Sequence, residues 1–471
     1  MAGFSIKHLF ERAKQAMTLA PKRTPERPAA FVQVGFDFGT AFSKVVLRDV
    51  NVRRAWVYRP LPFPGQDQSL PFLIPSLLYA GKSDGGWSLS VTRDDVHTHE
   101  IPFPKLALLQ SIQNPQETDI LDGYRRIAAA EGINEAELVR GIVSLYLASV
   151  LSGVFRHLRE SDMNFDFVKS DVASVCMAIP ARDLADPALT YAFLSCLRRG
   201  YWFAVSGADT TKPILLRDLL SHLSNYHCDP NHERRCELYP EVSANMISYT
   251  RSRAARLGIF QMVDVGAGTV DISFFSFVRH AGIPGLHNFS GIVEHCGSSQ
   301  IERIAAKTLG RPSDLTLLAR LRSIKEGNGS TRPTAAEREA LQFAREEIGE
   351  RLKRAVHISI CEMQDKLVHW QQIHDTQMIF VGGGAGCSPY ETAVFAKWDE
   401  LGKAHKGKVG IPTPDLELAT QHWHWFSRLT VAFGLSFDST ARPPLTVPAQ
   451  YENVERPEPE ERPSAVSKDE V

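Results

Sequence analysis

The residues that could do chemistry lie in two short glycine-containing segments that also carry aspartates. Residues 35–40 contain Asp37, and residues 264–271 begin with Asp264 and end with Asp271. Turns built from glycine and small residues let backbone N–H groups approach an anion closely, and such concavities bind phosphate. A carboxylate beside a phosphate repels it unless a hard cation lies between them. Mg²⁺ is commonly held by one or two carboxylates together with phosphate oxygens. The pattern predicts a Mg-nucleotide site.

Both segments are predicted to form the turns of β-hairpins. Branched apolar residues enter and leave each turn, at residues 32–34 and 45–47 for the first and at residues 259–263 and 270–277 for the second. Strand, turn, strand is the pattern of a hairpin. A Walker loop or a dinucleotide-binding loop runs from a strand into a helix, and neither consensus occurs here. Two facing tips would clamp a polyphosphate. The alternative is that the glycines only form tight turns.

Further segments match the motifs of one protein superfamily in the same order. Residues 74–79 are similar to its Thr-Pro-Ser strand, and residues 241–249 to its Glu-Pro-Thr-Ala-Ala-Ala-x-x-Tyr segment. Residues 350–354 are similar to its Glu-Arg-x-Lys-Arg helix, and residues 429–435 to its closing Val-Ala-x-Gly helix. Over residues 31–439 the chain therefore resembles the actin-like ATPase superfamily, and within it the nucleotide-binding domain of DnaK-type heat-shock chaperones.

The resemblance implies an α/β protein with a two-lobed actin-like ATPase fold, in which duplicated RNase H-like lobes enclose a nucleotide cleft. Lobe I is expected to comprise residues 31–253 plus 426–440, and lobe II residues 254–425. A chain of 471 residues with 43% hydrophobic content is large enough for two such cores. Independently of the resemblance, apolar spacing predicts a long helix at residues 135–158.

The roles of individual site residues also follow from the resemblance. Asp37 and Asp264 would hold Mg²⁺ through its water molecules. Glu241 and Asp271 would orient water and complete the metal shell, and Lys105 would stabilise the γ-phosphate. Phosphoryl transfer needs positioned phosphates, neutralised charge and an oriented attacking oxygen. The implied catalytic residues are Lys105, Glu241, Thr269 and Asp271, and the implied nucleotide ligands are Gly39, Thr40, Gly266, Ala267, Gly268, Glu350, Lys353, Arg354, Gly382, Gly383 and Gly384.

Two of these assignments have plain alternatives. Lys82 also lies downstream of the Thr-Pro-Ser-like strand, so it competes with Lys105 for the phosphate role. Glu350, Lys353 and Arg354 would clamp adenine by resemblance, but oppositely charged residues at this spacing stabilise any exposed helix.

The chain also departs from the family pattern. The family's Gly-Gly-Ser-Thr-Arg supplies an arginine that stacks on the purine, whereas residues 384–386 read Gly-Ala-Gly. Half of the expected adenine sandwich is therefore missing from the motif. Ala267 in place of a glycine and Ala41 in place of a polar residue are milder departures.

An insertion at residues 200–240 carries possible zinc ligands. Cys228, His232 and Cys236 are each separated by three residues, with His222 or His227 as a fourth ligand. Thiolates and neutral imidazoles suit Zn²⁺. The alternative is that these side chains only form polar surface.

Composition restricts the remaining function classes. The formal net charge of -1 gives no basic footprint for nucleic acid. No membrane-spanning stretch or cleavable signal peptide is predicted, so a cytoplasmic location is expected. The seven cysteines lack C-x-x-C spacing and fit reduced thiols better than a disulfide framework.

The two ends differ from the middle of the chain. Residues 1–30 hold six Lys or Arg against two Glu, and predict a basic amphipathic helix before a Pro-rich linker. This helix would bind a partner groove or an anionic lipid surface. The alternative is a frayed helix or one packed on its own domain. Residues 441–471 hold six prolines and seven acids, which predicts a disordered tail.

The predicted function is a DnaK-like ATPase module that couples slow hydrolysis to lobe opening and closing, and signals that state to a protein partner. No client-binding domain is expected after the closing helix. The alternatives are an actin-like filament subunit, a sugar-kinase-type phosphotransferase and a module that binds nucleotide without hydrolysis.

Overall fold

The structure, a computed structural model, describes residues 29–446 with several gaps. The gaps are residues 61–70, 84, 114–119, 162–164, 167–170, 181–182, 208, 227–232, 253–254, 281–282, 313, 328–331, 367–374, 412–414, 419 and 443–444. The predicted N-terminal helix lies outside the described residues, as do the zinc candidates His227, Cys228 and His232 and most of the predicted tail.

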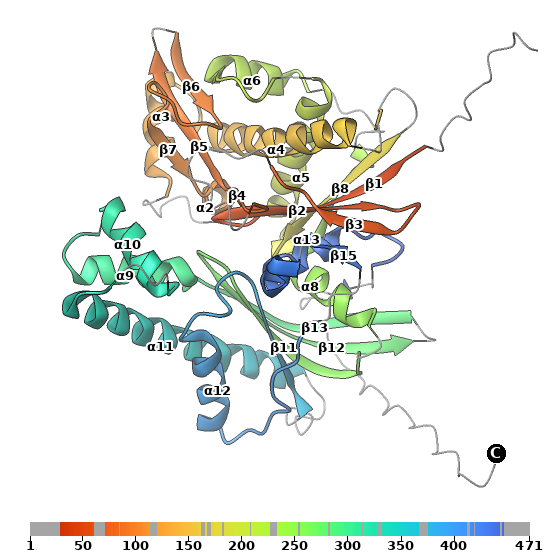
Figure 1. The fold of residues 1–471 in the computed structure, drawn as a ribbon, viewed down its shortest axis with the longest axis vertical. Helices are drawn as coiled ribbons and strands as arrows, with labels where there is room; N and C mark the ends of the chain where they lie inside the picture. Colours follow the sequence, from red (N-terminus) through yellow and green to blue (C-terminus); the bar gives the residue numbers. More distant parts are fainter. Residues whose placement is uncertain are drawn as a thin grey trace, which may run out of the picture.

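The described part of the chain is a mixed α/β protein with three β-sheets and eleven α-helices. The first sheet has the order β10-β8-β1-β2-β3-β15, with β4 paired to β2, and the second has the order β14-β11-β12-β13-β16. A small third sheet has the order β7-β5-β6-β9. Figure 1 shows the first and third sheets in the upper half of the molecule and the second sheet in the lower half.

The strands of the first sheet are β1 (Phe31–Asp37), β2 (Phe42–Asp49), β3 (Arg54–Val57), β4 (Ile74–Pro75), β8 (Val172–Ile179), β10 (Cys236–Pro240) and β15 (Leu416–Glu417). Those of the second sheet are β11 (Gly258–Val265), β12 (Val270–His280), β13 (Ile283–Glu294), β14 (Gln377–Val381) and β16 (Leu445–Thr446). The third sheet contains β5 (Leu77–Ser83), β6 (Gly86–Ser90), β7 (His99–Pro102) and β9 (Ile214–Leu215).

Helices cover the large sheets. In the upper half they are α2 (Pro104–Gln113), α3 (Asp122–Glu131), α4 (Glu135–Glu160), α5 (Pro187–Val205) and α6 (Leu216–Ser224), with the 3-10 helix η2 (Asp183–Ala185). Those of the lower half are α9 (Ser298–Thr308), α10 (Leu315–Lys325), α11 (Ala335–Lys366) and α12 (Tyr390–Glu400). Between the halves lie α8 (Glu241–Thr250), η4 (Thr420–Arg428) and α13 (Thr430–Leu435).

Both predicted hairpins are confirmed. β1 pairs antiparallel with β2, with Asp37 opposite Lys44. β11 pairs antiparallel with β12, and this register sets Asp264 opposite Asp271 at the end of the hairpin. Each hairpin also joins a parallel strand, β8 beside β1 and β14 beside β11. The two acidic turns are thus held on the inner strands of two separate sheets.

The first hairpin is buried on both faces. Val32, Val34 and Phe36 of β1 belong to the apolar core shared with α4 and α5. On the opposite face, α13 packs on β1, and a Cβ at Gly35 would clash with the carbonyl oxygen of Ala432. Glycine is needed there because the helix backbone lies directly against the strand. Strands buried on both faces lack the alternation of a half-exposed sheet, and β1 is buried at six of its seven positions.

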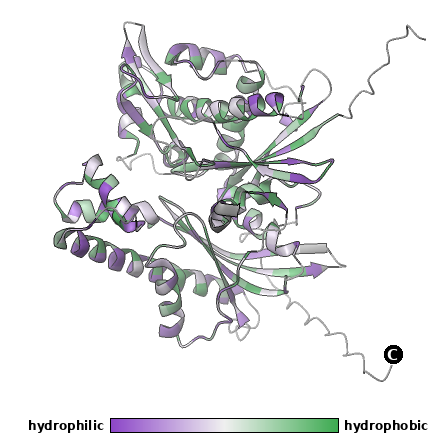
Figure 2. Ribbon diagram, viewed as in Figure 1, coloured by the Kyte–Doolittle hydropathy of each residue, from purple (hydrophilic) through white to green (hydrophobic). Residues whose placement is uncertain are grey.

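The predicted long helix is confirmed as α4, which begins at the N-cap Asn134 and ends at Glu160. Among the described residues it is the one helix long and apolar enough to cross a membrane by composition. However, 78% of its most apolar stretch is buried inside the protein. We therefore assign α4 to the core of the upper half. The hydropathy colouring in Figure 2 shows hydrophobic residues along the strands and hydrophilic residues on the outer turns of the helices.

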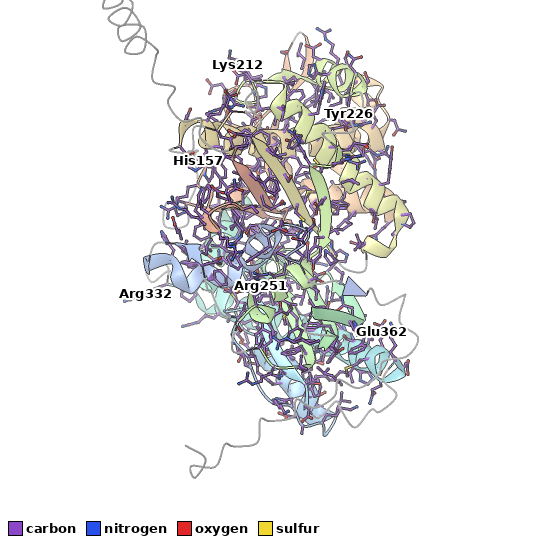
Figure 3. The ribbon with its side chains drawn as sticks, turned by 90° about the vertical axis from the view of Figure 1, so that its right-hand side faces the viewer. His157, Lys212, Tyr226, Arg251, Arg332 and Glu362 are labelled. Atoms are coloured by element: carbon purple, nitrogen blue, oxygen red, sulfur yellow. The ribbon has the colours of Figure 1, made fainter. Side chains whose placement is uncertain are left out.

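The second sheet has its own core, formed with α9, α11 and α12. The view in Figure 3, turned by 90°, separates the halves in the same way, with His157 and Lys212 in the upper half and Glu362 in the lower half. The first residues of the predicted tail differ from the prediction, because Arg442 is buried and residues 445–446 form β16 on the second sheet.

Candidate functional site

A cavity of about 1300 Å³ lies between the halves, and both acidic turns line it. The first turn contributes Asp37, Gly39 and Thr40. The other predicted residues on its wall are Lys105, Glu241, Asp264, Gly266, Ala267, Thr269, Asp271, Gly382, Gly383 and Gly384. Residues predicted from distant segments of the sequence therefore share one cavity.

The two turns meet. A Cβ added at Gly268 would lie 3.0 Å from Cγ2 of Thr40, so the second turn touches the first. A Cβ at Gly39 would clash with the carbonyl oxygen of Phe42, which explains the glycine at that position. The amide groups of Thr40, Ala267 and Gly268 have no hydrogen-bond partner within the part of the chain that is described. Such groups are donors for an anion.

Side chains from neighbouring elements hold each turn in place. Ser76, which follows β4, donates a hydrogen bond from Oγ to the carbonyl oxygen of Gly39 at 2.7 Å. Ser299 at the start of α9 donates from Oγ to the carbonyl oxygen of Ala267 at 2.6 Å, and the Ser298 amide donates to Gly266 at 2.9 Å. The turns are therefore preorganised.

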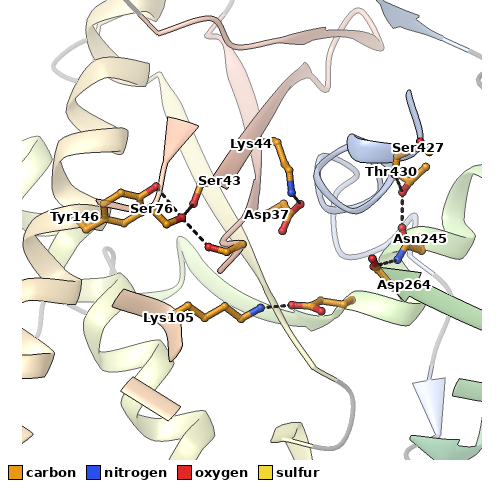
Figure 4. A network of polar contacts seen from close by, with 12 residues as sticks. Asp37, Ser43, Lys44, Ser76, Lys105, Tyr146, Asn245, Asp264, Ser427 and Thr430 are labelled. Atoms are coloured by element: carbon orange, nitrogen blue, oxygen red, sulfur yellow. Dashed lines mark hydrogen bonds and ion pairs between the residues drawn. The ribbon is translucent and has the colours of Figure 1, made fainter. Parts of the chain in front are cut away.

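Each metal-binding candidate has a polar partner (Figure 4). Lys44 Nζ lies 2.7 Å from Oδ2 of Asp37 in a part-buried ion pair. Asn245 on α8 donates from Nδ2 to Oδ2 of Asp264 at 2.9 Å, and the Thr430 hydroxyl donates to Oδ1 of Asn245. The second aspartate is thus tied to α8 and α13, the two helices between the halves.

Lys105 and Glu241 form a buried ion pair across the cavity wall. Nζ of Lys105, in the first turn of α2, lies 2.5 Å from Oε1 of Glu241, the first residue of α8. Burial, the largest single cause, would lower the pKa of Lys105, but the carboxylates of Glu241, Asp37 and Asp271 together leave this pKa raised. Lys82, the competing candidate, is exposed on β5 and does not line the cavity. Lys105 therefore stays charged at the site.

The surroundings of Asp264 and Asp271 disfavour the ionised form of both carboxyl groups. Burial, together with the Glu241 and Asp37 carboxylates, raises the pKa of Asp264 to about 6. Burial and the carboxylates of Glu241 and Asp264 raise the pKa of Asp271 well above its ordinary value. With Asp37 and Glu241 these make four carboxylates beside two lysines, Lys44 and Lys105. An added cation would relieve this repulsion.

The described residues contain no group of three His, Cys, Asp or Glu side chains close enough to hold a metal ion directly. Mg²⁺ commonly keeps several waters and needs only one or two carboxylates. Asp37 and Asp264 would supply that number of carboxylates.

The glycine turn after β14 forms another wall of the cavity. Gly382 has φ of +87° and donates its N–H to the carbonyl oxygen of Ser427 at 3.2 Å. A Cβ there would clash with Asp264, so the turn lies against the second aspartate. Arg428 in η4 reaches the same turn and donates to the carbonyl oxygen of Gly383 at 3.4 Å.

Arg428 also stacks on an aromatic ring. Its guanidinium carbon lies 4.0 Å from the centre of the Trp425 ring. Arg428 lines the cavity, whereas Trp425 does not. The tryptophan ring therefore contacts the guanidinium on the side away from the cavity. An arginine plane held in this way can stack on a base.

The predicted adenine clamp is not brought to this cavity. Glu350, Lys353 and Arg354 lie on α11, which packs on the second sheet, but none of the three lines the cavity. Lys353 pairs instead with Glu350 and with Glu400 of α12, each at 3.0 Å. These contacts match the plain alternative of charged pairs on an exposed helix.

Two of the zinc candidates are described, the buried Cys236 and the exposed His222, and both lie in the upper half. Cys236 is buried in β10, and burial raises the pKa of its thiol to about 12, which disfavours the thiolate. His222 on α6 lies against the rings of Trp202 and Phe203, with ring centres 5.1 and 5.0 Å away. Neither side chain belongs to a metal-binding group among the described residues.

Lys44, Asn245 and Arg428 were not among the residues predicted from the sequence. Lys44 had a detectable signal, since it is a lone lysine inside an apolar strand beside the first turn. Asn245 and Arg428 had none, because the residues to which they hydrogen-bond, Asp264 and Thr430 for Asn245 and Gly383 for Arg428, lie far away in the sequence. Neither a protein-family model nor a curated protein sequence matches this chain.

Proposed function

We propose that this chain is an actin-like, DnaK-type ATPase module that binds Mg-ATP between two lobes. The observation that carries the proposal is the contact between the two acidic hairpin turns at the wall of one cavity. Either turn alone would be an ordinary tight turn. Two turns from distant parts of the chain, each with an aspartate and available amides, form a clamp suited to a metal-bound polyphosphate.

The sheet topology supports the two-lobed fold. Each large sheet contains an antiparallel hairpin whose first strand pairs in parallel with a later strand, β1 with β8 and β11 with β14. In each, the second hairpin strand pairs antiparallel with a third, β2 with β3 and β12 with β13. The same unit thus occurs twice, which is what duplicated lobes require.

The cavity residues divide the chemistry between them. Asp37 and Asp264 would hold Mg²⁺ through water, and the metal would neutralise phosphate charge when bound. Lys105, fixed by Glu241, would meet the charge that develops on the γ-phosphate. Glu241 and Asp271 would orient the attacking water, and Thr40 and residues 266–269 would receive the phosphates. The base would lie toward Gly383 and Arg428.

The C-terminal segment supports coupling between the lobes and a partner. Arg442 pairs with Glu237 of the first sheet at 2.8 Å, and Leu445 of β16 pairs with Leu286 of the second sheet. This segment therefore contacts both halves before the chain continues into residues 447–471. A change in the angle between the lobes would alter the contacts of Arg442 and of residues 445–446 with one or both sheets. This segment is therefore suited to signal the nucleotide state to a protein partner.

Phosphate release from Mg-ATP tests the proposal. The natural protein should release phosphate slowly without an added acceptor. The double variant Lys105→Met/Glu241→Gln leaves neither charge of the pair buried alone, and it should lose about 100-fold or more in rate. Lys82→Met is the matched control and should leave the rate unchanged.

Other outcomes would contradict parts of the proposal. Release that requires a sugar or polyol would favour a phosphotransferase, and light scattering that rises with ATP would favour a filament. Binding with no release in any variant would indicate a module that holds nucleotide without hydrolysing it. Partner recovery that is the same with ATP and ADP would argue against signalling.

A further inference from the structure

Phe103 has a strained backbone at a position that matters for Lys105. Its φ is +58°, and Arg53 is the other described non-glycine residue with positive φ. Arg53 lies in an exposed turn, whereas Phe103 directly precedes α2, the helix that carries Lys105. A bulky residue in this region of backbone conformation is strained and persists only where its surroundings hold it.

Hydrogen bonds connect the backbone of Phe103 to the first acidic turn, residues 37–40. Its N–H donates to the carbonyl oxygen of Ser76 at 3.0 Å, and its own carbonyl accepts from Ala107 N–H at 3.0 Å in the first turn of α2. Ser76 in turn donates to Gly39 through its hydroxyl. Phe103 therefore connects the first acidic turn to the start of α2 through hydrogen bonds.

The ring of Phe103 makes a contact with the opposite half of the molecule. The guanidinium carbon of Arg303, on α9, lies 5.2 Å from the ring centre, and both residues line the cavity. α9 is itself fixed to the second turn through Ser298 and Ser299. Figure 1 shows α9 below α2 across the gap between the halves.

These contacts join the two turns by a second path. Thr40 and Gly268 touch directly. On the other path, Ser76 contacts both Gly39 and Phe103, and the ring of Phe103 contacts Arg303. Arg303 lies on α9, and the first residues of α9 hydrogen-bond to the second turn. Lys105 is two residues beyond Phe103, so separation of the halves at Arg303 would act on the segment that positions the lysine.

We propose that Phe103 and Arg303 form a latch that positions Lys105 when the two halves are together. In the closed arrangement Arg303 holds the ring, and the strained backbone keeps the first turn of α2 seated with Lys105 on Glu241. When the halves separate, the ring contact is lost and the first turn of α2 relaxes. Phe103 and Arg303 are positioning residues, because they act through Lys105. Their role during turnover rests on the proposed function, but the latch itself does not need nucleotide.

Hydrogen exchange of the nucleotide-free full chain tests the latch separately from the ATPase proposal. A cation–π contact at an exposed site contributes about 0.5–1 kcal/mol, which corresponds to roughly 2- to 5-fold in an opening equilibrium. Arg303→Ala should therefore speed exchange of the Phe103 and Ala107 amides by roughly this factor. Arg303→Lys keeps a cation over the ring and should stay close to the natural rate.

The matched control is Lys307→Ala, an exposed cation on the same helix that does not line the cavity. It should leave exchange at Phe103 and Ala107 unchanged. Unchanged exchange in Arg303→Ala, or equal acceleration in Lys307→Ala, would overturn the latch.

Turnover supplies a second reading of the latch. In Mg-ATP hydrolysis Arg303→Ala should lower kcat by a similar factor with a smaller effect on KM, because Lys105 and not the phosphate turns is displaced. If the natural protein fails to bind Mg-ATP, the proposed function fails, while the exchange result still decides the latch.

Discussion

Four carboxylates and two lysines face one another where the hairpin turns meet, and this excess of negative charge is the main chemical signal at the scale of single residues. Asp37 is paired with Lys44 and Glu241 with Lys105. Among the described residues, the hydrogen-bond partner of the Asp264 carboxylate is the neutral Asn245, and the pKa of Asp264 is raised to about 6. Groups perturbed by burial and by like charge concentrate at functional sites because folding alone does not favour them.

The raised pKa of Asp264 predicts pH-dependent metal binding. Above pH 6 the carboxyl group is ionised and available to the hydrated metal, and below pH 6 it is neutral. Mg-ATP affinity should therefore fall as the pH drops through 6, by up to about tenfold per pH unit from this group. Calorimetric titrations from pH 5 to 8 would measure the change.

Asp264→Asn is the control for this pH dependence, because the nucleotide itself also titrates. The variant should bind more weakly at pH 8 and should lose the part of the pH dependence that belongs to Asp264. Identical pH profiles for both proteins would show that Asp264 does not contact the metal shell.

From the position of Arg428 we expect its substitution to weaken binding of the base and to leave binding of the phosphates unchanged. Stacking on a base contributes about 1–3 kcal/mol, so Arg428→Ala should weaken Mg-ATP binding roughly 5- to 150-fold. Binding of Mg-tripolyphosphate, which lacks a base, should not change. Lys353→Ala is the control, since Lys353 does not line the cavity. A larger effect of Lys353→Ala than of Arg428→Ala would restore the clamp expected from the resemblance.

Close backbone contacts decide how the elements are arranged. α13 lies against β1 at Gly35 and against α8 at Gly434, and at both positions a Cβ would clash with backbone of the neighbouring element. α8 carries Glu241, the partner of Lys105, and Asn245, the partner of Asp264. The packing of α13 against both β1 and α8 therefore fixes where these side chains lie relative to the first turn.

Gly434→Ala should therefore destabilise the protein. The added methyl group meets the carbonyl oxygen of Ala244 on α8, and overpacking of this kind costs about 1–3 kcal/mol or more. Guanidinium denaturation would measure the loss. Gly123→Ala on α3 is the matched control, because nothing lies within 4 Å of its Cβ, and it should be neutral or slightly stabilising. Equal midpoints for the two variants would contradict the close contact between α13 and α8.

The elements with strong local patterns could be predicted from the sequence. Both hairpins and α4 were predicted because their apolar residues and turn glycines are local signals. The start of the C-terminal tail was wrong, since Arg442 is buried by contacts with Cys176 and Glu237 that no local pattern reveals. The Asn245 to Thr430 hydrogen bond likewise joins residues 185 positions apart. Side chains that are positioned by tertiary packing escape sequence patterns.

At the scale of the whole molecule, the site exists only where the two halves meet. The first sheet supplies Asp37 and Thr40, the second sheet supplies Asp264 and residues 266–269, and α8 between them supplies Glu241. Neither half by itself would supply the proposed clamp. A ligand held by both turns would bind the closed arrangement better than an open one, and a ligand shifts an equilibrium only through such differential affinity.

Calorimetric titration of Mg-ATP into the natural protein, Asp37→Asn and Asp264→Asn tests this account most directly. The natural protein should bind one Mg-ATP, and each variant should bind at least about tenfold more weakly, a loss of about 1.4 kcal/mol. Thermal unfolding of each variant should confirm that it is folded. Equal affinity in all three proteins, or no binding to the natural protein, would contradict a metal-bound nucleotide held between the two acidic turns.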